Sequence, residues 1–141
     1  MKFTKMERIT QKKGNDCGVA CVAMIIQKYA GCPAASSYDA AKAVMFGLAE
    51  AGYTNTEALR LGLESFGITI DQQRRSFRKK DSRNMGLEFD AIIATTPRKN
   101  GYWHWLVWDA SELCLFDPNP DKIDPHSHSK ASHYIKIMNF L

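Results

Sequence analysis

The 141-residue sequence lacks any apolar run long enough to cross a membrane. Its longest apolar stretch, residues 19–26, has eight residues, whereas a spanning helix needs about 20. The first 14 residues carry five basic side chains and no apolar segment that could form the core of a signal peptide. We therefore expect no membrane segment and a cytoplasmic location, with delivery into another cell as part of a larger protein as the alternative.

The sequence also lacks a disulfide or zinc-site pattern. Its four cysteines form neither a CxxC pair nor a paired zinc-ligand spacing: Cys17, Cys21, Cys32 and Cys114. A chain of this length that is 45% hydrophobic can bury a core without disulfides, so we expect reduced thiols. His126, His128 and His133 could ligate a metal, but no acidic or cysteine cluster accompanies them. No metal and no cofactor are expected.

Positive charge is concentrated in one place. The formal net charge is +4, and six basic residues fall within residues 74–83. Such a run is typical of a solvated loop; the alternative is a docking surface for an acidic partner. No nucleic-acid-binding module or glycine-aromatic pattern accompanies the charge, so nucleic acid is not an expected partner.

Helical patterns occupy the first half of the chain. Residues 18–29 are almost continuously apolar, which predicts a buried helix that Gly31 and Pro33 end. A second helix is predicted over about residues 37–51, with Gly52 as its stop. A third begins at one of the N-cap residues 54–56 and ends before Gly67.

The second half of the chain has the period of strands. The predicted strands are residues 68–71, 89–95, 102–108, 113–116 and 133–140. Asn100-Gly101 predicts one hairpin turn and residues 109–112 another, whereas residues 117–130 are predicted to be an irregular loop. Helices followed by an antiparallel sheet predict an α+β fold, and residues 1–141 are expected to form one domain.

Cys17 stands where a polar loop gives way to the buried helix. A cysteine at a helix N-terminus is favoured as the thiolate, because the helix dipole and the free N–H groups stabilise negative charge. A thiolate is the nucleophile that peptide-bond attack requires. Gln11, six residues earlier, is close enough for its amide to form an oxyanion hole with the Cys17 backbone N–H. Cys21, one turn further along, is expected in the core.

His104 is the candidate general base. It falls in the predicted strand 102–108, where alternation places it on the same face as Leu106 and Trp108. If that face meets the start of the helix, the imidazole reaches Cys17.

Asp117 is the candidate for the residue that orients the base. It follows the next strand, thirteen positions after His104, where a hairpin partner would return beside it. A carboxylate there would hold the imidazole in the tautomer that base catalysis needs. Asn119 or Asp121 could also take this role.

These residues resemble a known family. Residues 11–23, QKKGNDCGVACVA, resemble the cysteine motif of the bacteriocin-processing, double-glycine leader peptidase domains of peptidase-containing ABC transporters. Further segments resemble that family in the same order: residues 52–67, 89–94, 103–107 and 116–118. The resemblance implies a papain-like fold with Cys17 as nucleophile, His104 as base, Asp117 as orienting residue and Gln11 in the oxyanion hole.

The expected function is hydrolysis of a peptide bond in a protein or peptide substrate through an acyl-enzyme thioester, and the resemblance implies cleavage after a Gly-Gly pair. It also implies a stand-alone toxin module of bacterial competition as one setting, with an immunity protein as the expected partner. The alternatives are a deamidase or acyl-transfer enzyme with the same triad, and a non-catalytic domain that binds Gly-Gly peptides. Trp103 and Trp105 bracket His104. Most of the aromatic residues around His104 are expected in the core. As the alternative, one or two of them would form the flat walls of a narrow groove that admits glycine and excludes larger side chains.

Overall fold

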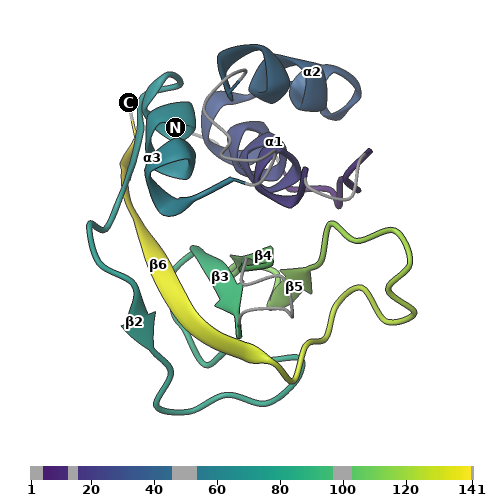
Figure 1. Ribbon diagram of the computed structural model, residues 1–141, viewed down its shortest axis with the longest axis vertical. Helices are drawn as coiled ribbons and strands as arrows, with labels where there is room; N and C mark the ends of the chain where they lie inside the picture. The colour runs from purple at the N-terminus through teal and green to yellow at the C-terminus, as the bar shows by residue number, and fades with distance from the viewer. Residues whose placement is uncertain (1–4, 13–15, 46–53, 97–102, 141) are drawn as a thin grey trace.

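The computed structural model describes residues 5–12, 16–45, 54–96 and 103–140, and a helical layer lies over one face of a sheet (Figure 1). The helices are α1 (Cys17–Ala30), α2 (Ala34–Met45) and α3 (Thr56–Glu64). All three coincide with predicted helices, although α2 begins at Ala34 rather than at residue 37. The predicted end of the second helix, near Gly52, lies outside the described residues.

Local chemistry accounts for the helix boundaries. α1 ends at Gly31, which has a left-handed φ of 67° and whose N–H bonds to the Ile26 carbonyl. α3 begins after Asn55, whose side-chain oxygen accepts a hydrogen bond from the Ala58 N–H at 2.8 Å. Of the three N-cap candidates in the sequence, Asn55 is therefore the one used.

α1 is a core helix. Twelve of its fourteen residues are buried, so it is enclosed on nearly all sides, unlike an amphipathic surface helix. It contacts α2, α3 and β4. No single helix in the described part of the chain is long and apolar enough to cross a membrane; α1 and α2 have that length and composition only as a pair bent by 118°.

The described strands form one six-stranded sheet in which every pairing is antiparallel. They are β1 (Ile68–Ile70), β2 (Arg75–Ser76), β3 (Ala91–Thr95), β4 (Trp105–Asp109), β5 (Cys114–Phe116) and β6 (Ala131–Phe140). Their order is β1-β6-β3-β4-β5, and β2 also pairs with β6. The expected α+β fold is confirmed, and each predicted strand is present.

One strand of the sheet was not predicted, and one predicted turn cannot be compared with the structure. β2 is an additional strand within the basic run, where a loop was expected. The predicted Asn100-Gly101 turn lies outside the described residues. β3 and β4 nevertheless pair as consecutive antiparallel strands, with Ala94 opposite Trp105.

The two faces of the sheet belong to separate cores. The face toward α1 carries Ile92, Trp105 and Val107. The opposite face carries Ile93, Leu106 and Trp108 and packs with Met85, from the chain between β2 and β3. The packing of the core between the helices and the sheet therefore determines the position of the start of α1 relative to the ends of β4 and β5.

Candidate active site

Cys17 is the first residue of α1, and its side chain is almost fully buried. The first N–H groups of a helix have no acceptor within the helix and point outward from its end. The N-cap residue Asp16 makes no side-chain cap bond to them. Its carboxylate instead accepts hydrogen bonds from Tyr38 Oη at 2.6 Å and Lys42 Nζ at 2.9 Å, both on α2. The Asp16 side chain is therefore bonded to α2 and not to the N–H groups at the start of α1.

Gly18 lets another segment approach the start of α1 closely. A Cβ atom at this position would lie 2.3 Å from Thr54 Cβ, well inside van der Waals contact. The Thr54 carbonyl in turn accepts a hydrogen bond from the Trp105 indole at 2.7 Å. The glycine that follows Cys17 is thus required by packing around the helix start.

β4 and β5 bring His104 and Asp117 together. His104 precedes β4, Asp117 follows β5, and the two strands pair with Val107 opposite Phe116. His104 Nε2 lies 2.8 Å from Asp117 Oδ1, and both side chains are nearly inaccessible. Because Nε2 is engaged by Asp117, Nδ1 is the ring nitrogen left to face the thiol.

The expectation that His104 shares a face with Leu106 and Trp108 is wrong. Those two side chains lie on the sheet face away from α1, and the α1 face carries Trp105 and Val107. His104 lies before the first residue of β4, so the two-residue alternation of the strand does not extend to it.

The buried site alters proton affinities. Burial by itself would lower the pKa of His104, but interactions with Asp117 and Cys17 outweigh it and raise that pKa above its ordinary value of 6.5. Burial would raise the pKa of Asp117, but its hydrogen bond to His104 and the imidazole's charge hold it below 3.8. Both shifts favour a charged imidazolium next to a charged carboxylate.

The segment that precedes α1 holds Asp117 in place. Arg8 donates from Nε to the Asp117 carbonyl at 2.9 Å and from Nη2 to the Asn119 carbonyl at 2.8 Å. The backbone N–H of Gln11 donates to the Pro118 carbonyl at 2.8 Å. The sequence reasoning missed Arg8, because a contact across 109 positions has no local pattern.

Among the three candidates for the orienting role, Asp117 is the one that contacts the imidazole. The backbone N–H of Asn119 donates to Asp117 Oδ1 at 2.8 Å, and the Asn119 side chain accepts from the Asp121 N–H. Asn119 thus supports Asp117, and Asp121 is exposed. Gln11 is buried in the segment beside them, and its oxyanion-hole role stays a prediction.

The two tryptophans beside His104 have different environments. Trp105 is 1% exposed and lies in the core beneath α1, which leaves it no surface for a substrate. The core expectation is therefore confirmed for Trp105, and its alternative place in a groove wall is wrong, because it lies on the helix-facing side of β4. Trp103 is half-buried, with the Arg74 guanidinium 4.3 Å above its ring and the edge of His133 against it. Trp103 remains a candidate for the wall.

The remaining cysteines and histidines form no metal-ligand cluster with one another or with acidic residues in the described part of the chain. All four cysteines are free thiols, and burial raises the pKa of Cys21 well above its ordinary value, with a further contribution from Cys17. His126 packs on Phe116. His128 Nε2 lies 3.8 Å from Asp117 Oδ2, on the other oxygen from the one that His104 contacts. The sequence reasoning gave His128 no place at this site.

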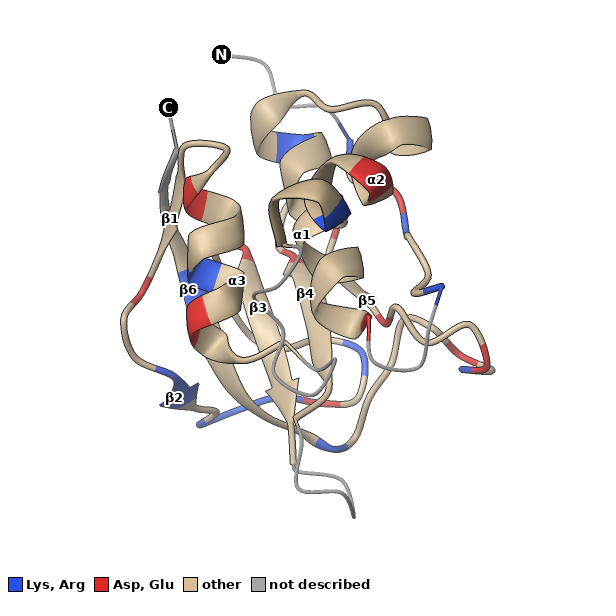
Figure 2. Cartoon of the chain, turned by 45° about the horizontal axis from the view of Figure 1, so that its top comes forward, with Lys and Arg blue, Asp and Glu red and all other residues tan. Residues whose placement is uncertain are grey.

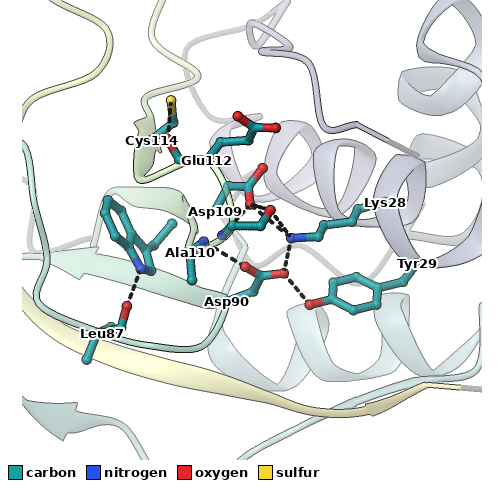
Figure 3. Close-up of polar contacts among 10 residues, drawn as sticks. Lys28, Tyr29, Leu87, Asp90, Asp109, Ala110, Glu112 and Cys114 are labelled. Atoms are coloured by element: carbon teal, nitrogen blue, oxygen red, sulfur yellow. Dashed lines mark hydrogen bonds and ion pairs between the residues drawn. The ribbon is translucent and has the colours of Figure 1, made fainter. Parts of the chain in front are cut away.

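A second buried polar cluster lies at the other end of α1 (Figure 3). Lys28 Nζ is 2.7 Å from Asp90 Oδ2 and 2.9 Å from Asp109 Oδ1, and it also donates to Ser111 Oγ at 3.1 Å. The Tyr29 hydroxyl donates to Asp90 as well. A cavity of about 600 Å³ borders this cluster, far along α1 from Cys17.

A cysteine at the start of a buried helix, with an imidazole and a carboxylate supplied by an antiparallel sheet, defines the arrangement of papain-like cysteine peptidases. The family model for the peptidase C39 family matches residues 5–138, and the chain belongs to this family. It is thus a papain-like cysteine peptidase. No curated protein sequence matches the chain.

Two solved structures share the fold. The peptidase domain of Streptococcus ComA, a bifunctional ABC transporter involved in a quorum-sensing pathway, is 15% identical with a TM-score of 0.53, over 95% of this chain and all of that domain. A double-glycine motif protease from an AMS/PCAT transporter, solved with its leader peptide, is 17% identical with a TM-score of 0.54, over 97% of this chain and 95% of that one.

Proposed function

We propose that this peptidase cleaves a protein or peptide substrate on the C-terminal side of a Gly-Gly pair. The observation that carries the proposal is the buried series Cys17, His104 and Asp117, in which Asp117 holds one ring nitrogen at 2.8 Å and the other is left for the thiol. A likeness to double-glycine peptidases in fold, together with membership of the C39 family, supports the choice of bond.

The proposed chemistry has two stages. The Cys17 thiolate attacks the carbonyl carbon of the second glycine, and His104 as imidazolium protonates the departing amine, so that a thioester remains on the sulfur. The neutral imidazole then takes a proton from water, which attacks the thioester and releases the glycine carboxylate and the thiol. Asp117 keeps the imidazole oriented in both stages. The Cys17 N–H and the Gln11 amide would stabilise the tetrahedral oxyanion.

A flat wall beside His104 would give the preference for glycine. Trp103 is the remaining candidate for this wall, since Trp105 is in the core. Trp103→Ala is expected to bring the rates for Gly-Gly and Gly-Ala peptides closer together by admitting the larger side chain. An unchanged ratio would remove Trp103 from the proposal.

The deciding experiment is mass spectrometry of a bacterial proteome incubated with the protein and, as the matched control, with Cys17→Ala. New N-termini that follow Gly-Gly and depend on Cys17 are expected, and their sequences name the substrate. Cys17-dependent mass changes of about one dalton at glutamine, without new N-termini, would replace peptidase activity with deamidation.

A toxin role and a cytoplasmic site of action stay predictions. Both are tested by producing the chain inside a bacterial cell. Growth arrest with the wild-type chain, absent with Cys17→Ala, is the expected result for a toxin. Normal growth despite full activity of the purified protein would contradict that role.

A further inference from the structure

A cavity of about 270 Å³ lies beside the imidazole, on the side of the loop that follows Asp117. Its described lining combines the ends of β3 and β4 with that loop: Thr95, Thr96, His104, Lys122, His128, Ser129 and Lys130. The cavity has the catalytic histidine as one wall and is separate from the cavity at the far end of α1.

The lining is basic. Two of the residues are lysines, and none of the described lining residues is acidic. Within the described part of the chain, neither Lys122 nor Lys130 has an ion-pair partner. Lys80 adds a third cation nearby, since its Nζ donates to the Ser129 carbonyl at 3.1 Å. Basic positions are concentrated at the lower edge of Figure 2, along β2 and the chain that follows it.

His128 does not supply this charge. Its Nδ1 accepts a hydrogen bond from the Lys130 N–H, and its Nε2 points toward Asp117 Oδ2. Burial first, and then the positive charge of Lys122, lower its pKa to about 4. With His128 neutral at pH 7, Lys122 and Lys130 add their positive charge to that of the His104 imidazolium in the cavity.

The proposed role of His104 indicates which part of a substrate would lie in this cavity. The imidazole must protonate the amine that leaves when the thioester forms, so the residues after the scissile bond pass next to His104. The carbonyl side of that bond is directed instead toward the helix start at Cys17. A pocket that has His104 as a wall therefore faces the leaving-group side.

We propose that the cavity lined by Lys122 and Lys130 binds a substrate carboxylate on the leaving-group side of the scissile bond. The inference rests on the proposed peptidase function and adds a substrate class to it, namely segments with an acidic residue within the first positions after Gly-Gly. Thr95 and Thr96 also line the cavity, but the Thr95 hydroxyl already donates to the Thr96 carbonyl at 3.1 Å, so the two lysines are the groups that would bind the carboxylate.

The test uses synthetic peptides with a Gly-Gly pair followed by Glu or by its neutral isostere Gln at the first or second position, all extended well beyond that point and amidated at the C-terminus. We expect kcat/KM to be roughly three- to tenfold higher for Glu than for Gln, the range for partly exposed charge pairs acting together. A peptide that ends two residues after Gly-Gly with a free carboxylate distinguishes a C-terminal carboxylate from a side chain as the preferred ligand.

Three variants locate the effect. Lys122→Gln combined with Lys130→Gln is expected to bring the Glu-to-Gln ratio close to one, and Lys122→Glu combined with Lys130→Glu to invert it. Lys79→Gln, at an exposed lysine outside the cavity, is the matched control and should keep the wild-type ratio. Equal cleavage of all peptides by the wild-type protein overturns the carboxylate site and leaves the peptidase function standing. Absence of Cys17-dependent cleavage of every peptide overturns the function and this inference with it.

Discussion

The two ends of α1 both place buried charged groups against the same strand, but they use them differently. At the N-terminal end Cys17 meets His104, just before β4; at the other end Lys28 meets Asp109, the last residue of β4. Eleven residues of helix rise about 16 Å, and the five steps from His104 to Asp109 extend about 17 Å. The matching spans let one helix lie along one strand with a polar contact at each end.

The two ends of α1 differ in how many hydrogen-bonding positions of their buried charged groups are occupied. The three N–H donors of Lys28 have three acceptors: Asp90, Asp109 and Ser111. Because each N–H is bonded, the ammonium group keeps its protons and is not available for proton transfer. At the other end, Asp117 contacts only one ring nitrogen of His104, which leaves the second ring nitrogen for Cys17. We infer that the Lys28 end contributes stability and the Cys17 end contributes chemistry. The predictions below test this division.

The largest effect is expected from Cys17→Ala. Loss of the nucleophile should lower kcat/KM by about 10⁴-fold or more, whereas the melting temperature should change little because a small apolar side chain still fills the site. Peptide cleavage and thermal unfolding of the same samples measure the two effects. Cys21→Ala is the control thiol, and its activity should be retained in the folded protein. An equal loss of activity in the folded Cys21→Ala variant would contradict the assignment of Cys17 as the nucleophile.

Lys28→Met should show the opposite pattern. Removing the cation leaves Asp90 and Asp109 buried without a counter-charge, which should cost about 3 kcal/mol of unfolding free energy. Adding Asp90→Asn and Asp109→Asn should recover much of this loss. Urea unfolding measures the stability, and kcat/KM below the unfolding transition should fall less than tenfold. A folded Lys28→Met protein without activity would contradict the division between the two ends.

Asp117→Asn should change both the rate and the pH profile. The pKa of His104 is raised above 6.5 partly by this carboxylate, and the active pair needs the imidazole protonated. Without the charge, burial lowers that pKa, so the alkaline limb of kcat/KM should move to lower pH and the rate should fall roughly 100-fold. Asp121→Asn, at an exposed position, is the control. An alkaline limb at the same pH in both variants would show that Asp117 does not tune the base.

Gly18→Ala should produce the smallest effect of the four. Its Cβ would lie 2.3 Å from Thr54 Cβ, so the helix start must shift, at a cost of about 1–3 kcal/mol. Adding Thr54→Gly removes the clashing atoms and should restore part of the activity. Cleavage rates and thermal unfolding of the single and double variants measure these effects. A fully active Gly18→Ala variant would show that position 18 accepts a side chain larger than that of glycine.

The pattern of residues along the chain predicted much of this molecule. The apolar run after Cys17 predicted the core helix, and the alternating segments predicted the sheet. The order of Gln11, Cys17, His104 and Asp117 predicted which side chains would be near the helix start, but left the choice among Asp117, Asn119 and Asp121 open. Hydrogen bonding across paired strands decided that choice.

Other features could not be predicted, because they depend on contacts between distant segments. Alternation placed His104 on the wrong face, since the strand begins one residue after it. No local pattern marks the partners of Arg8 and Lys28, which lie 109 positions away in one case and 81 in the other. The sequence left Trp105 as a candidate for either the core or a groove wall, and the side of β4 that meets α1 decided for the core.

The sequence by itself determined the chemistry that is available: a cysteine at the start of an apolar helix, a histidine and a carboxylate after it, and lysines in the loop that follows. These are properties of residue type and local spacing, which short-range propensities encode. Only the tertiary structure decided which carboxylate contacts the imidazole. It also decided that Lys28 pairs with Asp90 and Asp109 at the other end of α1, and that Lys122 and Lys130 line a cavity beside His104. Those outcomes depend on how helix and sheet pack, and packing joins residues that no local pattern connects.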